Sequence, residues 1–354
     1  AGPDNTAPEI LDFLTHIMQE VKEVGFDIEV FNHQISCLSF SIDERTSMSI
    51  PFVDEGDRWD ERTEADIWLA IARVLENAAI AKIMCYGMFD ASFILSTNNI
   101  HIKGDIRDVY LASRILYPDF PASLQFLTSL YTDQPYYKDD RKLWNRIRED
   151  PITFWLYSAR DSVVLPQIWE ELSSELLADP DYQRMYDRTI ALWEPCLYMM
   201  TNGIRINVEA LKELKAEVTY ELEIKAADLE KASDYTFNPN SPKQCLQYFY
   251  EHKNIRPYIS RRTGKPTCDD KALTRIIRRY NLPEARLAQD IRGLGKLLNT
   301  YLDLQYDDDD RLRCFYNPRG TTTGRLSSSK TVRETGLNFQ NLHPRFKRFL
   351  VVDE

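Results

Sequence analysis

The segment Phe26-Asp27-Ile28-Glu29-Val30 alternates apolar and acidic side chains with the two-residue period of a β-strand. Asp27 and Glu29 therefore project from the same face of the predicted strand, with Cα atoms about 6.6 Å apart. Two carboxylates at this separation suit a divalent metal ion. Their apolar neighbours indicate a buried strand, in which charged groups need partners. A solvated strand edge is the alternative that this segment alone leaves open.

The sequence around this strand alternates helical and strand patterns, which is typical of an α/β domain. Residues 8–24 predict an amphipathic helix, and three consecutive strands are expected at 26–30, 35–42 and 47–53. Further helices and one buried strand then follow: a helix at 64–77, the strand at 81–86, and helices near 88–97, 105–116, 122–130 and 152–176. We predict that this α/β domain occupies residues 1–190.

Beyond residue 190 the pattern becomes mainly helical. A long charged helix is predicted over residues 208–231, and shorter helices are expected near 241–252, 269–280 and 284–304. The acidic run 307–310 then predicts a turn into a strand over 311–316. We therefore divide this half into a helical domain over residues 191–304 and a short β-containing domain over residues 305–354.

The charge of the chain is unevenly distributed. The net charge of the 354 residues is −11, but residues 1–194 hold 17 basic against 34 acidic side chains, whereas residues 195–354 hold 27 against 21. An acidic first half suits a divalent-metal site, and a basic second half suits phosphate contact. The six cysteines are scattered and no apolar run reaches the roughly 18 residues of a membrane span, so we expect a cytoplasmic protein without membrane contact.

Two further acidic positions follow along the α/β region. Asp90 begins a predicted helix directly after the strand 81–86, where an acid that stabilises the helix N-terminus is the simpler interpretation. Tyr157 and Asp161 lie four residues apart and so share one face of a predicted helix, an arrangement that chance also produces. The order of these residues along the chain is more informative than any one of them.

In that order and spacing, Asp27/Glu29, Asp90 and Tyr157/Asp161 resemble the three exonuclease motifs of DnaQ-like proofreading domains. The resemblance covers most of the α/β region and implies an RNase H-like fold. It also implies two divalent ions, Mg²⁺ or Mn²⁺, with Asp27, Glu29 and Asp161 holding one and Asp27 with Asp90 holding the other. Tyr157 would orient the attacking water or the phosphate.

The second half resembles the thumb and the start of the palm of family A DNA polymerases, the group of bacterial polymerase I and phage replicative enzymes. The stretch Phe237-Asn-Pro-Asn-Ser-Pro-Lys-Gln244 is similar to the family's Asn-x-x-Ser-Pro-Lys-Gln turn. Ser241 can cap a helix that begins at Pro242, and a plain capping motif explains these two residues. It does not explain Lys243, which the resemblance assigns to DNA binding.

The stretch Thr321-Thr-Thr-Gly-Arg-Leu-Ser-Ser-Ser-Lys330, followed by Leu337-Asn-Phe-Gln-Asn-Leu342, resembles the segment with which this family grips the primer-template. Nine basic residues oppose one acidic residue over 311–350. Gly320 and Gly324 permit close backbone approach, and hydroxyl and guanidinium groups suit phosphate oxygens. The predicted DNA-binding residues are Thr323, Arg325, Ser327, Ser328, Ser329, Asn338, Gln340, Asn341 and Lys243. A Ser/Thr-rich phosphate loop unrelated to polymerases is the alternative.

The catalytic aspartates of the family's palm have no counterpart in the sequence, since the surroundings of Asp353 differ from the family's. We therefore expect a two-metal 3′–5′ proofreading exonuclease joined to a primer-template-binding region, either a split-polymerase subunit or a fragment, that does not polymerise DNA alone. Its expected partners are a single-stranded 3′ end, the primer-template duplex, and a second polypeptide with palm and fingers.

Two alternatives remain open from the sequence. The first is a DNA-binding scaffold with an inactive nuclease site, because Tyr86 stands where the exonuclease family usually has an Asn four residues before the second-motif Asp. The second is an independent nuclease unconnected to a polymerase, which the two polymerase-like motifs disfavour.

Overall fold

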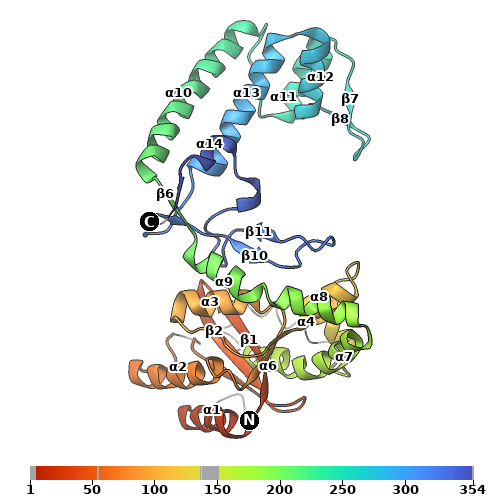
Figure 1. Ribbon diagram of the computed structural model, residues 1–354. Coiled ribbons are helices and arrows are strands. Elements are labelled where there is room, and N and C mark those ends of the chain that lie inside the picture. Colours follow the sequence, from red (N-terminus) through yellow and green to blue (C-terminus); the bar gives the residue numbers. More distant parts are fainter. Residues whose placement is uncertain (1–4, 54–55, 136, 138–150, 353–354) are drawn as a thin grey trace. The chain divides into compact units, whose positions relative to one another are not determined.

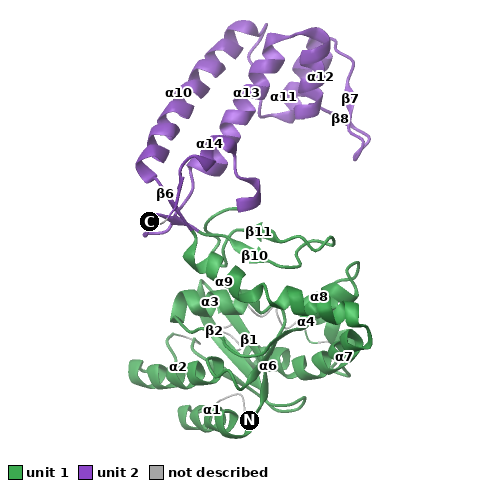
Figure 2. Cartoon of the chain, in the orientation of Figure 1, with its two compact units in different colours: residues 1–203, 313–337 green, residues 204–312, 338–354 purple. Residues whose placement is uncertain are grey.

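The computed structural model describes residues 5–53, 56–135, 137 and 151–352 (Figure 1). The chain forms two compact units, each of them discontinuous in sequence (Figure 2). The first unit contains residues 1–203 and 313–337, and the second contains residues 204–312 and 338–354. The boundaries at residues 190 and 304 separate the three domains expected from the sequence, and this division remains a prediction.

The first unit is built on a five-stranded sheet with the order β3-β2-β1-β4-β5. Three strands form an antiparallel meander: β1 (Glu23–Phe31), β2 (Gln34–Ser41) and β3 (Ser47–Pro51). Two strands run parallel on the other side of β1: β4 (Ala81–Met84) and β5 (Ile106–Asp108). The strands predicted at 26–30, 35–42, 47–53 and 81–86 are confirmed, with their ends shifted by a few residues.

Nine helices belong to the described part of this unit. They are α1 (Ala7–Glu20), α2 (Glu61–Leu75), α3 (Met88–Asn98), α4 (Val109–Leu116), α5 (Leu124–Tyr131), α6 (Pro151–Val163), α7 (Leu165–Ala178), α8 (Pro180–Ile190) and α9 (Trp193–Asn202). Helices α1 and α2 pack against each other, and both contribute to the main hydrophobic core beside the sheet.

Three helix predictions need correction. The helix expected at 8–24 ends at Glu20, because the chain from Glu23 pairs with β4 and β2. The stretch 105–116 is a strand followed by a helix, since Asp108 ends β5 and caps α4. The stretch 152–176 is two helices, α6 and α7, and Pro166 in the first turn of α7 explains the break because proline lacks the N–H of a helix interior.

Residues 313–337 fold onto the first unit although more than a hundred residues separate them from α9. They form a hairpin of β10 (Phe315–Asn317) and β11 (Ser327–Ser329). Phe315 joins the main core, and its ring centre lies 5.6 Å from that of Tyr86. Arg313 Nε donates to the Thr201 carbonyl at 2.7 Å. The hairpin is therefore an integral part of this unit.

The second unit combines a small sheet with a helical bundle. The sheet has the order β12-β6-β9 and consists of β6 (Ile204–Ile206), β9 (Arg311–Leu312) and β12 (Leu350–Val351). The bundle contains α10 (Val208–Ala232), α11 (Pro242–Leu246), the π-helical η2 (Gln247–His252), β7 (Tyr258–Ile259), β8 (Pro266–Thr267), α12 (Asp270–Tyr280), α13 (Pro283–Leu297) and the π-helical η3 (Leu298–Leu302). The one-turn elements η4 (Phe339–Asn341) and α14 (Pro344–Lys347) complete it.

The long helix predicted at 208–231 is confirmed, as are the shorter ones, each within a few residues. The strand predicted over 311–316 is two short strands, β9 and β10, which belong to different sheets. Strands β6, β7, β8, β11 and β12 were not predicted, because two or three residues are too few to show a periodic pattern. Among the described residues, no helix is both long enough and apolar enough to cross a membrane.

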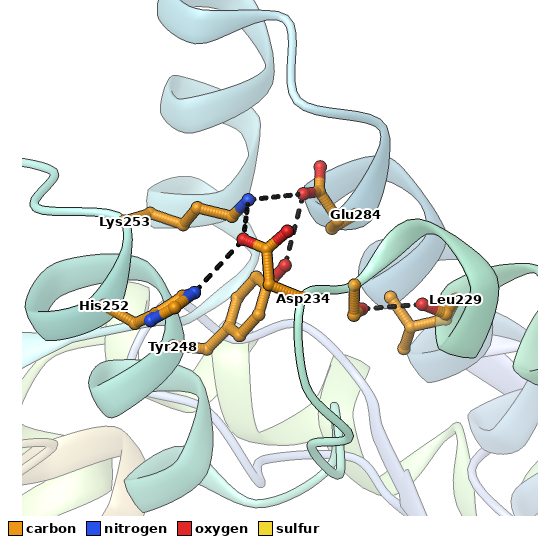
Figure 3. A network of polar contacts seen from close by, with 7 residues as sticks. Leu229, Asp234, Tyr248, His252, Lys253 and Glu284 are labelled. Atoms are coloured by element: carbon orange, nitrogen blue, oxygen red, sulfur yellow. Dashed lines mark hydrogen bonds and ion pairs between the residues drawn. The ribbon is translucent and has the colours of Figure 1, made fainter.

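A network of polar contacts ties η2 and α13 to Asp234, which lies just beyond the end of α10 (Figure 3). Glu284 is 3% exposed, and its Oε1 accepts hydrogen bonds from the Tyr248 hydroxyl at 3.2 Å and from Lys253 Nζ at 3.1 Å. Lys253 also donates to Asp234 at 2.6 Å, and His252 Nε2 lies 3.1 Å from the same Asp234 oxygen. The network places a carboxylate inside the bundle with a cation beside it.

Candidate active site

The candidate site starts from one face of the hairpin β1–β2. The strand register pairs Asp27 with Ser39 and Gly25 with Ser41. Because side chains alternate across a strand, Gly25, Asp27 and Glu29 share one face, and Ser39 and Ser41 lie beside them. The predicted common face of Asp27 and Glu29 is therefore present in the sheet.

Helix α6 lies across this face and is held by two serine hydroxyls. Ser39 Oγ donates to the Ser158 carbonyl at 2.8 Å, and Ser41 Oγ donates to the Ser162 carbonyl at 2.7 Å. Ser158 and Ser162 are four helical residues apart, an advance of about 6.0 Å, and Ser39 and Ser41 are two strand residues apart, an advance of about 6.7 Å. Because the two distances nearly match, both bonds can form together when α6 runs along β2. Gly25 permits this approach, since a Cβ there would lie 2.4 Å from the Ser162 carbonyl oxygen.

Helix α6 brings Asp161 to the two strand carboxylates. One oxygen from each of Asp27, Glu29 and Asp161 lies within 4.8 Å of the other two. Glu29 is 9% exposed and Asp161 4%. Three carboxylates this close repel one another unless a cation is bound, and an all-oxygen donor set suits Mg²⁺ or Mn²⁺ better than a soft metal. The residues present therefore fit a divalent ion.

Asp90 lies next to this group without joining it. Its carboxyl, 4% exposed, accepts a hydrogen bond from the Ile28 N–H at 3.0 Å. Ile28 lies beyond the last residue of β1 that pairs with β4, so Asp90 takes the place of the missing strand neighbour. Burial, together with the charge of nearby Asp27, raises the pKa of the Asp90 carboxyl well above its usual range. A second cation beside Asp27 would favour the ionised form.

Tyr157 lies on the same face of α6 as Asp161 and is 4% exposed. Burial and the carboxylates Asp161, Glu29 and Asp27 raise the pKa of its hydroxyl, which therefore keeps its proton and can donate it in a hydrogen bond. The ring of Tyr137 packs edge-on against Tyr157, with centres 5.8 Å apart.

Tyr137 is a site residue that the sequence did not predict. Its hydroxyl donates to Asp161 Oδ1 at 2.7 Å and so orients that carboxylate. It lies in a stretch without a periodic pattern, and no local signal in the sequence distinguishes it from the chain's other tyrosines.

Tyr86, predicted to stand where the exonuclease motif usually has an Asn, takes a left-handed backbone with φ of 61°. Asp108, 1% exposed, supports this turn: its carboxyl accepts hydrogen bonds from the N–H groups of Tyr86 at 3.3 Å and Gly87 at 2.9 Å. Burial raises the pKa of Asp108 to about 6. The Tyr86 ring packs against Tyr110, with centres 4.9 Å apart, so this part of the site's wall is aromatic.

The three clustered carboxylates and Tyr157 line one hollow of about 760 Å³. Its lining includes Asp27, Glu29, Tyr157 and Asp161, and aromatic side chains that include Tyr86, Tyr110 and Phe120. A cavity of this size holds a nucleotide, and rings such as these offer faces for base stacking.

The residues predicted to bind DNA fall in both units. In the first unit, Thr323 and Arg325 are exposed on the loop between β10 and β11, whereas Ser328 in β11 is 7% exposed. Thr321 Oγ1 accepts a hydrogen bond from the Arg325 N–H at 3.0 Å, which fixes this loop locally. Ser327 and Ser329 also belong to β11, where they pair with β10.

In the second unit, Gln340, Asn341 and Lys243 are exposed and Asn338 is half-buried. Asn338 Oδ1 accepts a hydrogen bond from the Gln340 N–H at 2.9 Å, so its side chain caps η4. Lys243 lies in the first turn of α11, behind the predicted Ser241 cap, which the structure confirms. The assignment of all nine residues to DNA contact remains a prediction.

Comparison with known proteins agrees with both halves of the sequence interpretation. Residues 6–177 match the family model described as 3′–5′ exonuclease, and residues 208–345 match that of DNA polymerase family A. The chain therefore joins an exonuclease region to a polymerase-family region. It belongs to the family A DNA polymerases.

The relatives cover different shares of the chain. A DNA polymerase of Escherichia phage T5 is 26% identical over 58% of this chain and 27% of its own length. DNA polymerase I of Synechocystis is 28% identical over 77% of this chain and 28% of its own length. The chain thus spans about a quarter of the length of these curated relatives.

One solved structure matches nearly the whole chain. It is the POL domain of Pol1 from M. smegmatis, in complex with DNA primer-template and dNTP, with a TM-score of 0.74 and 18% identity. The alignment covers 98% of this chain and 58% of that one. At this identity the likeness supports the fold alone.

Proposed function

We propose that the first unit is a two-metal 3′–5′ exonuclease that removes nucleotides from a DNA strand end, within a polymerase whose catalytic palm lies outside these 354 residues. The cluster of Asp27, Glu29 and Asp161, with Asp90 beside it, is the observation that supports this most directly. The sheet order β3-β2-β1-β4-β5 supports an RNase H-like description of the unit.

Each side chain has a role in this proposal. Asp27, Glu29 and Asp161 hold one Mg²⁺ or Mn²⁺, and Asp27 with Asp90 holds a second. When bound, such a pair supplies an activated water and charge stabilisation for the departing 3′ oxygen. The Tyr157 hydroxyl donates a hydrogen bond to the water or the phosphate, and Tyr137 keeps the Asp161 carboxylate in its orientation.

We further propose that Thr323, Arg325, Ser327–Ser329, Asn338, Gln340, Asn341 and Lys243 contact primer-template DNA. The exposed positions of Arg325 and Lys243 support this role. Whether the polymerising segment belongs to the same polypeptide or to a second one is decided by the reading frame that follows Glu354.

The test is hydrolysis of a 5′-labelled single strand in Mg²⁺. The expected result is a ladder of products shortened by one nucleotide at a time, absent with a chelator and absent in Asp27→Asn. The matched control is Asp66→Asn, the same isosteric change at an exposed acid on α2, which retains activity.

An intact strand in both Mg²⁺ and Mn²⁺, together with measurable DNA binding, would contradict the nuclease proposal. It would instead support the scaffold with an inactive site, in which Tyr86 has replaced the supporting Asn.

A further inference from the structure

The hollow that contains the carboxylates is also lined by residues from the second sequence segment of the first unit, residues 313–337. Asn317 and Gly320, from the hairpin segment 313–337, line it together with Arg114 of α4. Nearly three hundred residues separate Gly320 from Asp27 in the sequence. A segment matched by the polymerase-family model thus forms part of the wall of the exonuclease hollow.

Two hydrogen bonds fix this wall. Asn317 Nδ2 donates to the Tyr110 hydroxyl at 3.1 Å, and Arg319 Nη2 donates to the Arg114 carbonyl at 3.3 Å. Gly324, with φ of 72°, lets the Arg319 guanidinium lie under the hairpin loop, since a Cβ there would lie 2.5 Å from Arg319 Nη1. The hairpin is therefore attached to the same helix that carries Arg114.

Arg114 is the only lysine or arginine that lines the hollow among the residues that the structure describes. Its Nη1 donates to the Pro118 carbonyl at 2.6 Å and lies 3.4 Å from that of Phe120, which holds the guanidinium in place. Within the described ranges it forms no ion pair with a carboxylate, and neither its Nε nor its Nη2 donates to the protein. The lining of the hollow thus includes a cation whose Nε and Nη2 are left to donate to a ligand, as far as the described residues go.

The neighbouring Arg319 adds to the positive charge at this wall. It is 9% exposed, and its Nε has no hydrogen-bond partner in the part of the chain that the structure describes. Burial and the Arg114 charge lower the pKa of its guanidinium. Two adjacent cations without a carboxylate are stabilised when an anion binds between or beside them.

We propose that Arg114 binds a backbone phosphate of a single strand whose 3′ end reaches the carboxylates, at a linkage other than the one being cleaved. This rests on the proposed exonuclease function. The carboxylate cluster and its ions take the cleaved phosphate, so the guanidinium is left for another. Phe120 also lines the hollow and is 58% exposed, so it offers a face on which a base can stack. Arg319 is a positioning residue that attaches the hairpin to α4.

The first test compares Arg114→Met and Arg114→Lys in the full chain. Loss of a charge-assisted hydrogen bond corresponds to about a 10- to 100-fold higher KM for single-stranded DNA, with a smaller change in kcat. Arg114→Lys should recover part of this, because it keeps the charge. Arg62→Met, at an exposed arginine of α2, is the matched control and should equal the wild type.

The second test identifies the phosphate. Single uncharged methylphosphonate linkages are placed in turn along the strand. For the wild type, a methylphosphonate at one linkage other than the cleaved one should weaken DNA binding by the same factor as Arg114→Met does. The affinity of Arg114→Met should not change when that linkage is replaced. If Arg114→Met still responds to every linkage as the wild type does, its effect is structural and the inference fails.

A binding measurement separates this inference from the nuclease proposal. Fluorescence anisotropy with a short single strand is measured in chelator, on the Asp27→Asn background, where no hydrolysis occurs. Weaker binding upon Arg114→Met supports the phosphate contact even if the wild type proves inactive as a nuclease. Equal affinity of the two proteins, with and without Arg114→Met, overturns the phosphate contact even if the wild type is an active nuclease.

Discussion

The buried carboxylate of Glu284 is stabilised by its ion pair with Lys253, whose Nζ lies 3.1 Å from Glu284 Oε1 (Figure 3). Replacing Lys253 by Met leaves a buried carboxylate without its cation, which typically costs about 3 kcal/mol. We expect a decrease of this size in the free energy of unfolding measured with urea. Lys231→Met, at an exposed end of α10, should change it by less than about 0.5 kcal/mol.

The double variant Lys253→Met/Glu284→Leu distinguishes the cause. It removes the charge and its partner together, so it should be more stable than Lys253→Met alone. A double variant no more stable than the single one would show that the lysine acts through packing.

Lys82 on β4 is fully buried, and its Nζ donates to the carbonyls of Asn77 at 2.6 Å and Lys103 at 2.7 Å. Burial lowers its pKa to about 8. Between this value and the ordinary lysine pKa, the unfolded chain keeps a proton that the folded chain has lost, so the contribution of Lys82 to stability rises with pH. Below pH 8 both states are charged, and the cost of burying the charge applies in full.

We therefore expect the stability of the wild type relative to Lys82→Met to increase as pH rises from about 8 to 10.5, by at most about 3 kcal/mol. Thermal or urea unfolding of both proteins at several pH values measures this difference. Lys22→Met, at an exposed lysine, is the matched control. A flat difference between the wild type and Lys82→Met would refute the prediction.

At the scale of elements, the position of α6 on the sheet decides whether Asp161 reaches Asp27. The hydroxyls of Ser39 and Ser41 fix that position through carbonyls of α6. The variant Ser39→Ala/Ser41→Ala keeps every site carboxylate but removes the two serine donors that join α6 to β2. We expect at least a tenfold loss of nuclease kcat, because small displacements of catalytic groups are costly, and about 1 kcal/mol of stability per lost bond.

Ser96→Ala provides the comparison, since the Ser96 hydroxyl donates to the Phe93 carbonyl of its own helix and joins no two elements. It should retain activity. Full nuclease activity in the double serine variant would show that α6 is positioned by its apolar contacts alone.

At the scale of the whole molecule, the unequal charge of the two halves predicts where salt matters. Primer-template binding should weaken steeply with salt, because cations in contact with phosphates release counterions. Arg325→Ala should reduce affinity about tenfold and make the salt dependence shallower, whereas Asp27→Asn should leave both nearly unchanged. Arg45→Ala, whose side chain is 86% exposed on the first unit, is the control. Equal effects of Arg325→Ala and Arg45→Ala would contradict the assignment of the segment 321–330 to DNA binding.

The sequence predicted four of the five strands of the first unit's sheet and most helices, because their periodic patterns are local. It also predicted the carboxylates that cluster, since Asp27 and Glu29 share a strand face and Asp161 follows Tyr157 on a helix. It did not predict Tyr137 or Asp108 as supports of the site. Their roles depend on neighbours that are distant in the chain, or on a turn whose left-handed residue, Tyr86, carries no local signal.

The sequence by itself determined the residue types, their order and the family to which the chain belongs. Only the tertiary structure decided that α6 brings Asp161 to β1, that residues 313–337 belong to the first unit, and that Arg114 faces the carboxylates' hollow. The physical reason is that periodicity and capping act over a few residues. Contacts across hundreds of residues form because the fold buries apolar groups such as Phe315 and satisfies buried polar groups with whichever partners it brings near.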